Sequence, residues 1–203
     1  MTRRITGVTA LLVVFATAAC VAHRAPPSAS AHLIAGVPFF PQDPHQCGPA
    51  ALAALVSFVG QPTGPEAIAH EIYQPTIEGT STAAMLAYGA RHHLPIEARC
   101  GTLADLHREI DAGRPIVALL SQGMLIRSYH FVVVTGYDPA GGALYGYSGR
   151  DADAQWTAED FLKRWDRADN WALVWVGGEH AVARPAPYHG TGEQHQTGAD
   201  EGK

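Results

Sequence analysis

Apolar residues recur at helical spacing in the first half of the chain. Residues 49–59 carry an i, i+3, i+4, i+7 stripe that ends at Gly60, formed by Leu52, Leu55, Val56 and Val59. Three later segments combine helical composition with a capping residue, and the last of them also ends at a glycine. The pattern predicts helices over residues 49–59, 63–73, 81–93 and 102–113, the later three capped by Thr63, by Ser81 or Thr82, and by Thr102.

The spacing changes in the second half of the chain. Runs of β-branched and aromatic residues predict strands over residues 115–120, 129–137, 143–148 and 171–176. Residues 138–142 form a hairpin turn between two of them, and Thr157 caps one more helix over residues 157–165. Helices followed by strands predict an α+β domain, in which an N-terminal helical half packs on a C-terminal antiparallel sheet.

The two ends of the chain have a different composition. Residues 1–20 have a basic start, an apolar stretch and a small-residue end, which is typical of a signal peptide. The end resembles a bacterial lipoprotein box, so Cys20 is the expected lipidation site and membrane anchor; an ordinary cleaved signal or an uncleaved anchor is the alternative. Residues 21–35 read as a flexible tether and residues 178–203 as a disordered tail, which leaves 36–177 as the folded domain. We therefore expect an exported protein of the bacterial outer membrane or envelope.

Length and charge restrict the class of protein further. The chain has 203 residues and a formal net charge of −5, which fits one compact domain and gives no basic surface for nucleic acid. None of its histidines has the spacing of a metal site, so no metal or cofactor is expected. Of the three cysteines, Cys47 and Cys100 remain able to pair if Cys20 is lipidated. We expect Cys100 to be a buried small apolar residue instead.

Cys47 lies where a proline-bounded polar loop meets the first predicted helix. Backbone N–H groups and the helix dipole at that end favour an anion, so the position is expected to lower the thiol pKa and to yield a nucleophilic thiolate. Gly48 would let a substrate backbone approach. With Ala50 and Ala51 it suggests a narrow approach that suits small substrate residues.

Two other residues complete a candidate site for acyl transfer. His130 opens a strongly apolar strand and is the expected general base. Gln42, in the loop before Cys47, is the expected donor to an oxyanion, with Gln46 as a rival.

The segments 38–52 and 130–138 resemble cysteine peptidase family 39, papain-like enzymes that cut bacteriocin leaders after a double glycine. The resemblance implies a papain-like fold, Cys47 as nucleophile, His130 as base and Gln42 in the oxyanion hole. The family usually orients its histidine with an aspartate, whereas Ser148 occupies that place here. Asp151 or Asp153 could reach in from the next loop, although both read more simply as turn residues. The sequence shows no G-x-x-x-x-G-K-[ST] phosphate loop, so ATP-driven export is not expected of this chain.

These observations predict a cysteine peptidase of the cell envelope that acts on a peptide or protein at small-residue, Gly-Gly-like sites. Two alternatives stay open: a weakened peptidase-like domain that binds peptides or an envelope partner, and an acyltransferase or amidase that uses the same thiol.

Overall fold

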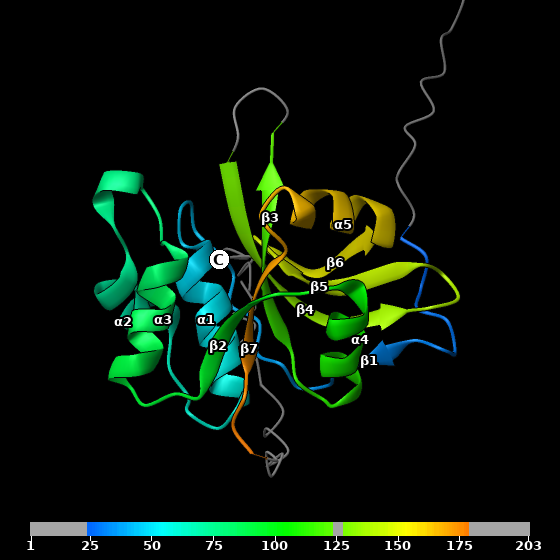
Figure 1. The fold of residues 1–203 in the computed structure, drawn as a ribbon, viewed down its shortest axis with the longest axis horizontal. Helices are drawn as coiled ribbons and strands as arrows, with labels where there is room; N and C mark the ends of the chain where they lie inside the picture. The colour runs from blue at the N-terminus through cyan, green and yellow to red at the C-terminus, as the bar shows by residue number, and fades with distance from the viewer. Residues whose placement is uncertain (1–23, 124–127, 179–203) are drawn as a thin grey trace, which may run out of the picture.

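The computed structural model describes residues 24–123 and 128–178, and within them the chain forms one antiparallel sheet flanked by helices (Figure 1). The strands are β1 (His32–Leu33), β2 (Ile96–Cys100), β3 (Ile116–Gln122), β4 (Ser128–Asp138), β5 (Ala143–Ser148), β6 (Asp151–Thr157) and β7 (Trp171–Trp175). Their order is β2-β7-β3-β4-β5-β6, and β1 pairs with β4 beyond the end of β3. Strand β4 is therefore the centre of the sheet.

Helices cover both faces of this sheet, as Figure 1 shows. They are α1 (Cys47–Phe58), α2 (Pro65–Ile72), α3 (Thr82–Arg91), α4 (Leu103–Asp111) and α5 (Ala158–Asp166), with a short 3₁₀ turn, η1 (Pro75–Ile77). One core joins α1, α2 and α3 to the sheet, and a second core joins α4 and α5 to the other face. The predicted α+β class, with a helical half packed on an antiparallel sheet, is confirmed.

Strand alternation explains how one sheet serves two cores. Along β4, Phe131 and Val133 face α1, while Val132 and Val134 face α4 and α5. Side chains of a strand point alternately to the two faces, so an unbroken apolar run is needed when both faces are covered. The apolar run from Phe131 to Val134 thus identifies a central strand.

The predicted caps place three of the helices. Ser81, Thr102 and Thr157 each accept a hydrogen bond from the backbone N–H three residues later. These bonds satisfy N–H groups that have no partner within the helix. The cap predicted at Thr63 is different: Gly64 occupies the N-cap of α2, and Pro65 is its first helical residue.

The N-terminal segment differs from the tether predicted for residues 21–35. Residues 24–35, which we call the N-terminal strap, lie against the sheet. The strap forms β1, and the Ser28 hydroxyl donates a hydrogen bond of 2.8 Å to Asp138. His32 forms an ion pair of 2.6 Å with Asp111 of α4. Composition alone predicted flexibility, whereas the strap finds partners on elements that come much later in the chain. The predicted signal peptide with Cys20, and residues 179–203 of the predicted tail, lie outside the described residues.

Cys100 also differs from the prediction. It is the last residue of β2, an edge strand, and its side chain is exposed rather than buried. Cys47 and Cys100 are both free thiols, so the disulfide that the cysteine count allowed is not formed.

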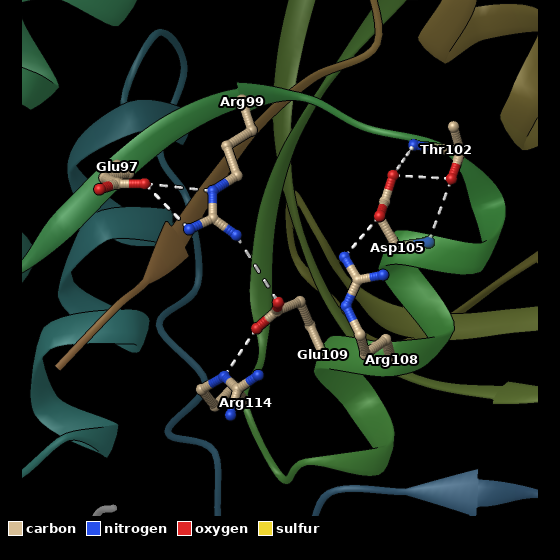
Figure 2. A network of polar contacts seen from close by, with 7 residues as sticks. All are labelled: Glu97, Arg99, Thr102, Asp105, Arg108, Glu109 and Arg114. Carbon is tan, nitrogen blue, oxygen red and sulfur yellow. Dashed lines mark hydrogen bonds and ion pairs between the residues drawn. The ribbon is translucent and has the colours of Figure 1, made fainter. Parts of the chain in front are cut away.

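A polar network ties α4 to the edge of the sheet (Figure 2). Glu109 of α4 is buried, with its side chain 7% exposed, and its carboxylate pairs with Arg114 at 2.6 Å and with Arg99 at 3.9 Å. Arg99 also binds Glu97 at 2.9 Å on the same strand. A buried carboxylate needs such partners because leaving water is costly for a charge. Arg108 and Asp105 form a separate pair at the exposed start of α4.

We expect Glu109→Ala to lower the free energy of unfolding by about 2–3 kcal/mol, because it leaves two arginines without their shared buried carboxylate. Urea unfolding should show a lower midpoint at an unchanged slope. Arg108→Ala is the matched control, since the Arg108–Asp105 pair is exposed and solvent screens its charges, so its loss should barely move the midpoint. Equal losses in the two variants would contradict a special role for Glu109.

Candidate active site

Three of the predicted site residues line one cavity of about 890 Å³ between the helical layer and the start of β4: Gln42, Cys47 and His130. Cys47 is the first residue of α1, and His130 lies near the start of β4. The fold therefore brings together side chains that are far apart in the sequence.

Cys47 is surrounded by backbone N–H groups but is also half-buried. Burial raises the pKa of its thiol, and the N–H groups of Phe131, Gly48 and Cys47 itself oppose that shift. The net direction is upward, which contradicts the lowered pKa expected from the helix N-terminus. The reason is desolvation: removing water disfavours the thiolate more than the N–H groups stabilise it. The contribution from Phe131 also places the thiol beside the backbone that follows His130.

The Ser148 hydroxyl is the hydrogen-bond partner of the His130 ring, and among the described residues no carboxylate binds that ring. Its Nε2 lies 3.1 Å from the Ser148 hydroxyl oxygen. Burial lowers the pKa of its imidazole. The carboxylate of Asp151 binds Arg24 instead, and Asp153 is exposed. Of the three candidates for the third position, the structure places Ser148 against the ring.

Gln42 is buried, with 7% of its surface exposed, and forms two hydrogen bonds with a single residue, Gly149. Its side-chain oxygen accepts the Gly149 N–H at 3.2 Å, and its own backbone N–H donates to the Gly149 carbonyl at 3.1 Å. Because the amide oxygen is engaged, the NH₂ on the other branch is the group left to donate. Its rival, Gln46, lines a different cavity with Ala50 on the far side of the loop.

No group of three or more His, Cys, Asp or Glu side chains within the described ranges is placed to hold a metal ion. Over the same residues, none of the helices has the length and apolarity needed to cross a membrane.

Comparison with known proteins identifies the family. Residues 34–173 match the Peptidase_C39 like family. The chain belongs to this family. The predicted resemblance to cysteine peptidase family 39 is thus confirmed, and membership supports a peptidase function. No curated protein matches the chain.

Solved structures of C39 peptidases share the fold of this chain. A putative C39-like peptidase from Bacillus anthracis is 16% identical over 72% of this chain and 98% of its own, with a TM-score of 0.58. The peptidase domain of Streptococcus ComA, a bifunctional ABC transporter, is 17% identical over 69% and 98%, with a TM-score of 0.56. A double glycine motif protease solved with a leader peptide is 18% identical over 70% and 91%, with a TM-score of 0.54.

The small residues near Cys47 have other roles than the prediction gave them. A Cβ on Gly48 would lie 2.6 Å from the Thr80 side chain, so Gly48 is required by packing against Thr80. Ala51 is completely buried in the core, and Ala50 faces the second cavity. None of the three narrows the approach to the thiol, which removes the sequence argument for small substrate residues.

Sequence reasoning missed the turn that holds this site. Residues 148–151 connect β5 to β6 through Gly149, at φ +63°, and Arg150. A glycine at the first position of a two-residue connection is a hairpin signal. The segment after it, 151–157, has few β-branched residues, so its composition predicts a loop and hides the hairpin. Thr80, whose hydroxyl is buried without a hydrogen-bond partner in the described residues, gave no signal at all.

Proposed function

We propose that the protein is a cysteine peptidase in which Cys47 forms an acyl-enzyme. The observation that supports this is the shared cavity, with the thiol, the imidazole and the Gln42 amide on its wall. In the proposed reaction Cys47 attacks a peptide carbonyl, His130 takes the thiol proton and then gives it to the leaving amine, and water releases the thioester. The Cys47 N–H and the Gln42 NH₂ stabilise the oxyanion.

The hydrogen bond to Ser148 supports the proposed role of His130. When Nε2–H donates to the Ser148 oxygen, Nδ1 is left as the basic nitrogen for the thiol. Burial raises the thiol pKa and lowers the imidazole pKa, so both shifts favour the neutral pair in the free protein. We therefore propose that His130 removes the proton as attack begins, rather than holding a preformed thiolate.

The proposed substrate is a peptide with a small-residue, Gly-Gly-like cleavage site. Support comes from the likeness to a double glycine motif protease that was solved with a leader peptide. We further propose that the protein acts in the bacterial envelope, anchored through a lipid on Cys20. Fatty-acid labelling of the full chain and of its Cys20→Ala variant tests the anchor.

Iodoacetamide tests the chemistry. We expect the rate of cleavage of a Gly-Gly substrate peptide to fall in proportion to the alkylation of Cys47. The alkylation is measured by mass spectrometry of the protein fragment that contains Cys47. The exposed Cys100 will also react, so Cys100→Ser is the matched control and should be inactivated at the same rate as the natural protein. Full activity after complete alkylation of Cys47 would rule out the proposal.

The raised thiol pKa and the neutral Ser148 favour one alternative, a weakened domain that binds peptides without cutting them. This alternative predicts that a Gly-Gly peptide binds, slows the alkylation of Cys47, and is recovered intact.

A further inference from the structure

The turn at residues 148–151 contacts every part of the candidate site except the thiol. Ser148 binds His130, and Gly149 binds Gln42 through two hydrogen bonds. Arg150 pairs with Asp43 in the loop that carries Gln42, at 2.6 Å. The last residue of the turn, Asp151, has its partner outside the site.

Asp151 carries a carboxylate next to Ser148, the residue that binds the imidazole. It lies directly opposite Ser148 in the β5–β6 register. Residues directly opposite in an antiparallel pair place their side chains on the same face, with Cβ atoms about 5 Å apart. The Asp151 side chain is therefore a neighbour of the hydroxyl that binds His130.

Arg24 of the N-terminal strap forms an ion pair with the Asp151 carboxylate. Its guanidinium binds Asp151 in bidentate fashion, with Nη1 at 3.0 Å from one oxygen and Nη2 in contact with the other. This geometry is the strongest form of the pair, and the hydrogen bond from Arg24 is the main reason that the pKa of Asp151 is lowered. Asp151 is only about one-third exposed, so water screens its charge incompletely.

Within residues 24–123 and 128–178, few other charged or titratable groups line the cavity. They are Cys47 on α1, Asp43 and His45 in the preceding loop, Glu78 near η1, Tyr129 on β4 and Arg150 in the turn. Asp43 and Arg150 neutralise each other. A carboxylate freed at residue 151 would thus be a new net charge on the side of the ring that faces Ser148.

We propose that Arg24 is a positioning residue of this site: its ion pair with Asp151 neutralises the carboxylate beside the Ser148–His130 contact and fixes the turn that carries Ser148. The strap is then a functional part of the domain rather than a spacer. The inference rests on the proposed function for the role of His130, but the effect of the Arg24–Asp151 pair on the His130 pKa can be measured without any catalysis.

The test is NMR titration of the His130 ring, in full-length protein carrying Cys47→Ala so that the thiol does not titrate together with the imidazole. Arg24→Ala should raise the pKa of His130 by about 0.5 to 1.5, since an unpaired negative charge beside Ser148 stabilises the imidazolium. Asp151→Asn should lower it, because Arg24 is then left unpaired. The double variant should return close to the starting value, and Arg24→Lys should change it little.

This set of variants separates charge from misfolding. A disrupted fold would expose His130 and also raise its pKa, but adding Asp151→Asn would not reverse that change. Arg108→Ala removes another exposed ion pair, on α4, and should leave His130 unaffected. The same upward shift in the single and double variants, or no shift in Arg24→Ala, would overturn the proposal.

The proposed function can fail separately. Suppose that the natural protein cuts no peptide while the His130 pKa rises in Arg24→Ala and falls in Asp151→Asn. In that case the electrostatic role of Arg24 stands and the peptidase reaction does not. If it cuts, the acid limb of kcat/KM should move with the His130 pKa in Arg24→Ala.

Discussion

Cys47→Ala should abolish peptide cleavage, with a loss in kcat of at least about 10⁴-fold. The alanine keeps the shape of the first turn of α1 but removes the only atom that can form the acyl bond in the proposed reaction. Removal of a nucleophile from a comparable triad costs on the order of 10⁶-fold, and what remains comes from substrate binding and the oxyanion donors. Cleavage is measured by mass spectrometry on a Gly-Gly peptide.

Cys100→Ala is the control for this loss. Cys100 is free and exposed at the end of β2, and it lines a different cavity from that of the proposed site. We expect this variant to keep full activity. If Cys47→Ala retained more than a few per cent of the activity, Cys47 would not be the nucleophile.

His130→Gln should lower kcat by about 10²- to 10⁴-fold while KM changes little. Glutamine can keep a hydrogen bond to Ser148, but it cannot take up the thiol proton. The loss should be large because the thiol pKa is raised by burial, so little thiolate is present without the base. A variant that changed KM alone would show that His130 only binds substrate.

The pH dependence of kcat/KM should also report the protonation of His130. Burial lowers the pKa of His130, so its imidazole stays neutral at pH values below the ordinary histidine pKa of about 6.5. In the natural protein kcat/KM should fall with acid only below that value, and the acid limb should vanish in His130→Gln. His107→Gln is the matched control. Burial also lowers the pKa of His107, but this residue belongs to α4 and stacks on Tyr137, away from the candidate site. An acid limb that persists in His130→Gln would assign it to another group.

Local patterns predicted most of the secondary structure. The apolar stripe before Gly60 corresponds to α1, and the run from Phe131 to Val134 to the centre of β4. Each signal lies within about a dozen residues, since helix periodicity, caps and strand runs depend on near neighbours. Segment 151–157 was missed because its pairing with β5 depends on the turn and on packing rather than on its own residues.

The direction of the thiol pKa shows a limit of local reasoning. From the sequence, Cys47 at a helix N-terminus predicts stabilisation of the thiolate. The structure adds the sheet beside it, and the resulting loss of water outweighs the N–H groups. How much water a group loses depends on all the elements packed around it, which no local pattern contains.

The α+β class, a helix directly after Cys47, and the candidate residues Gln42, Cys47 and His130 could all be predicted from the sequence. These follow from short-range spacing and from residue chemistry. Only the tertiary structure decided that Ser148 binds the imidazole, that Gly149 holds Gln42, and that Asp151 is taken by Arg24. The partners in each of these pairs are at least 18 residues apart in the chain, so their meeting depends on strand register and on the path of the strap.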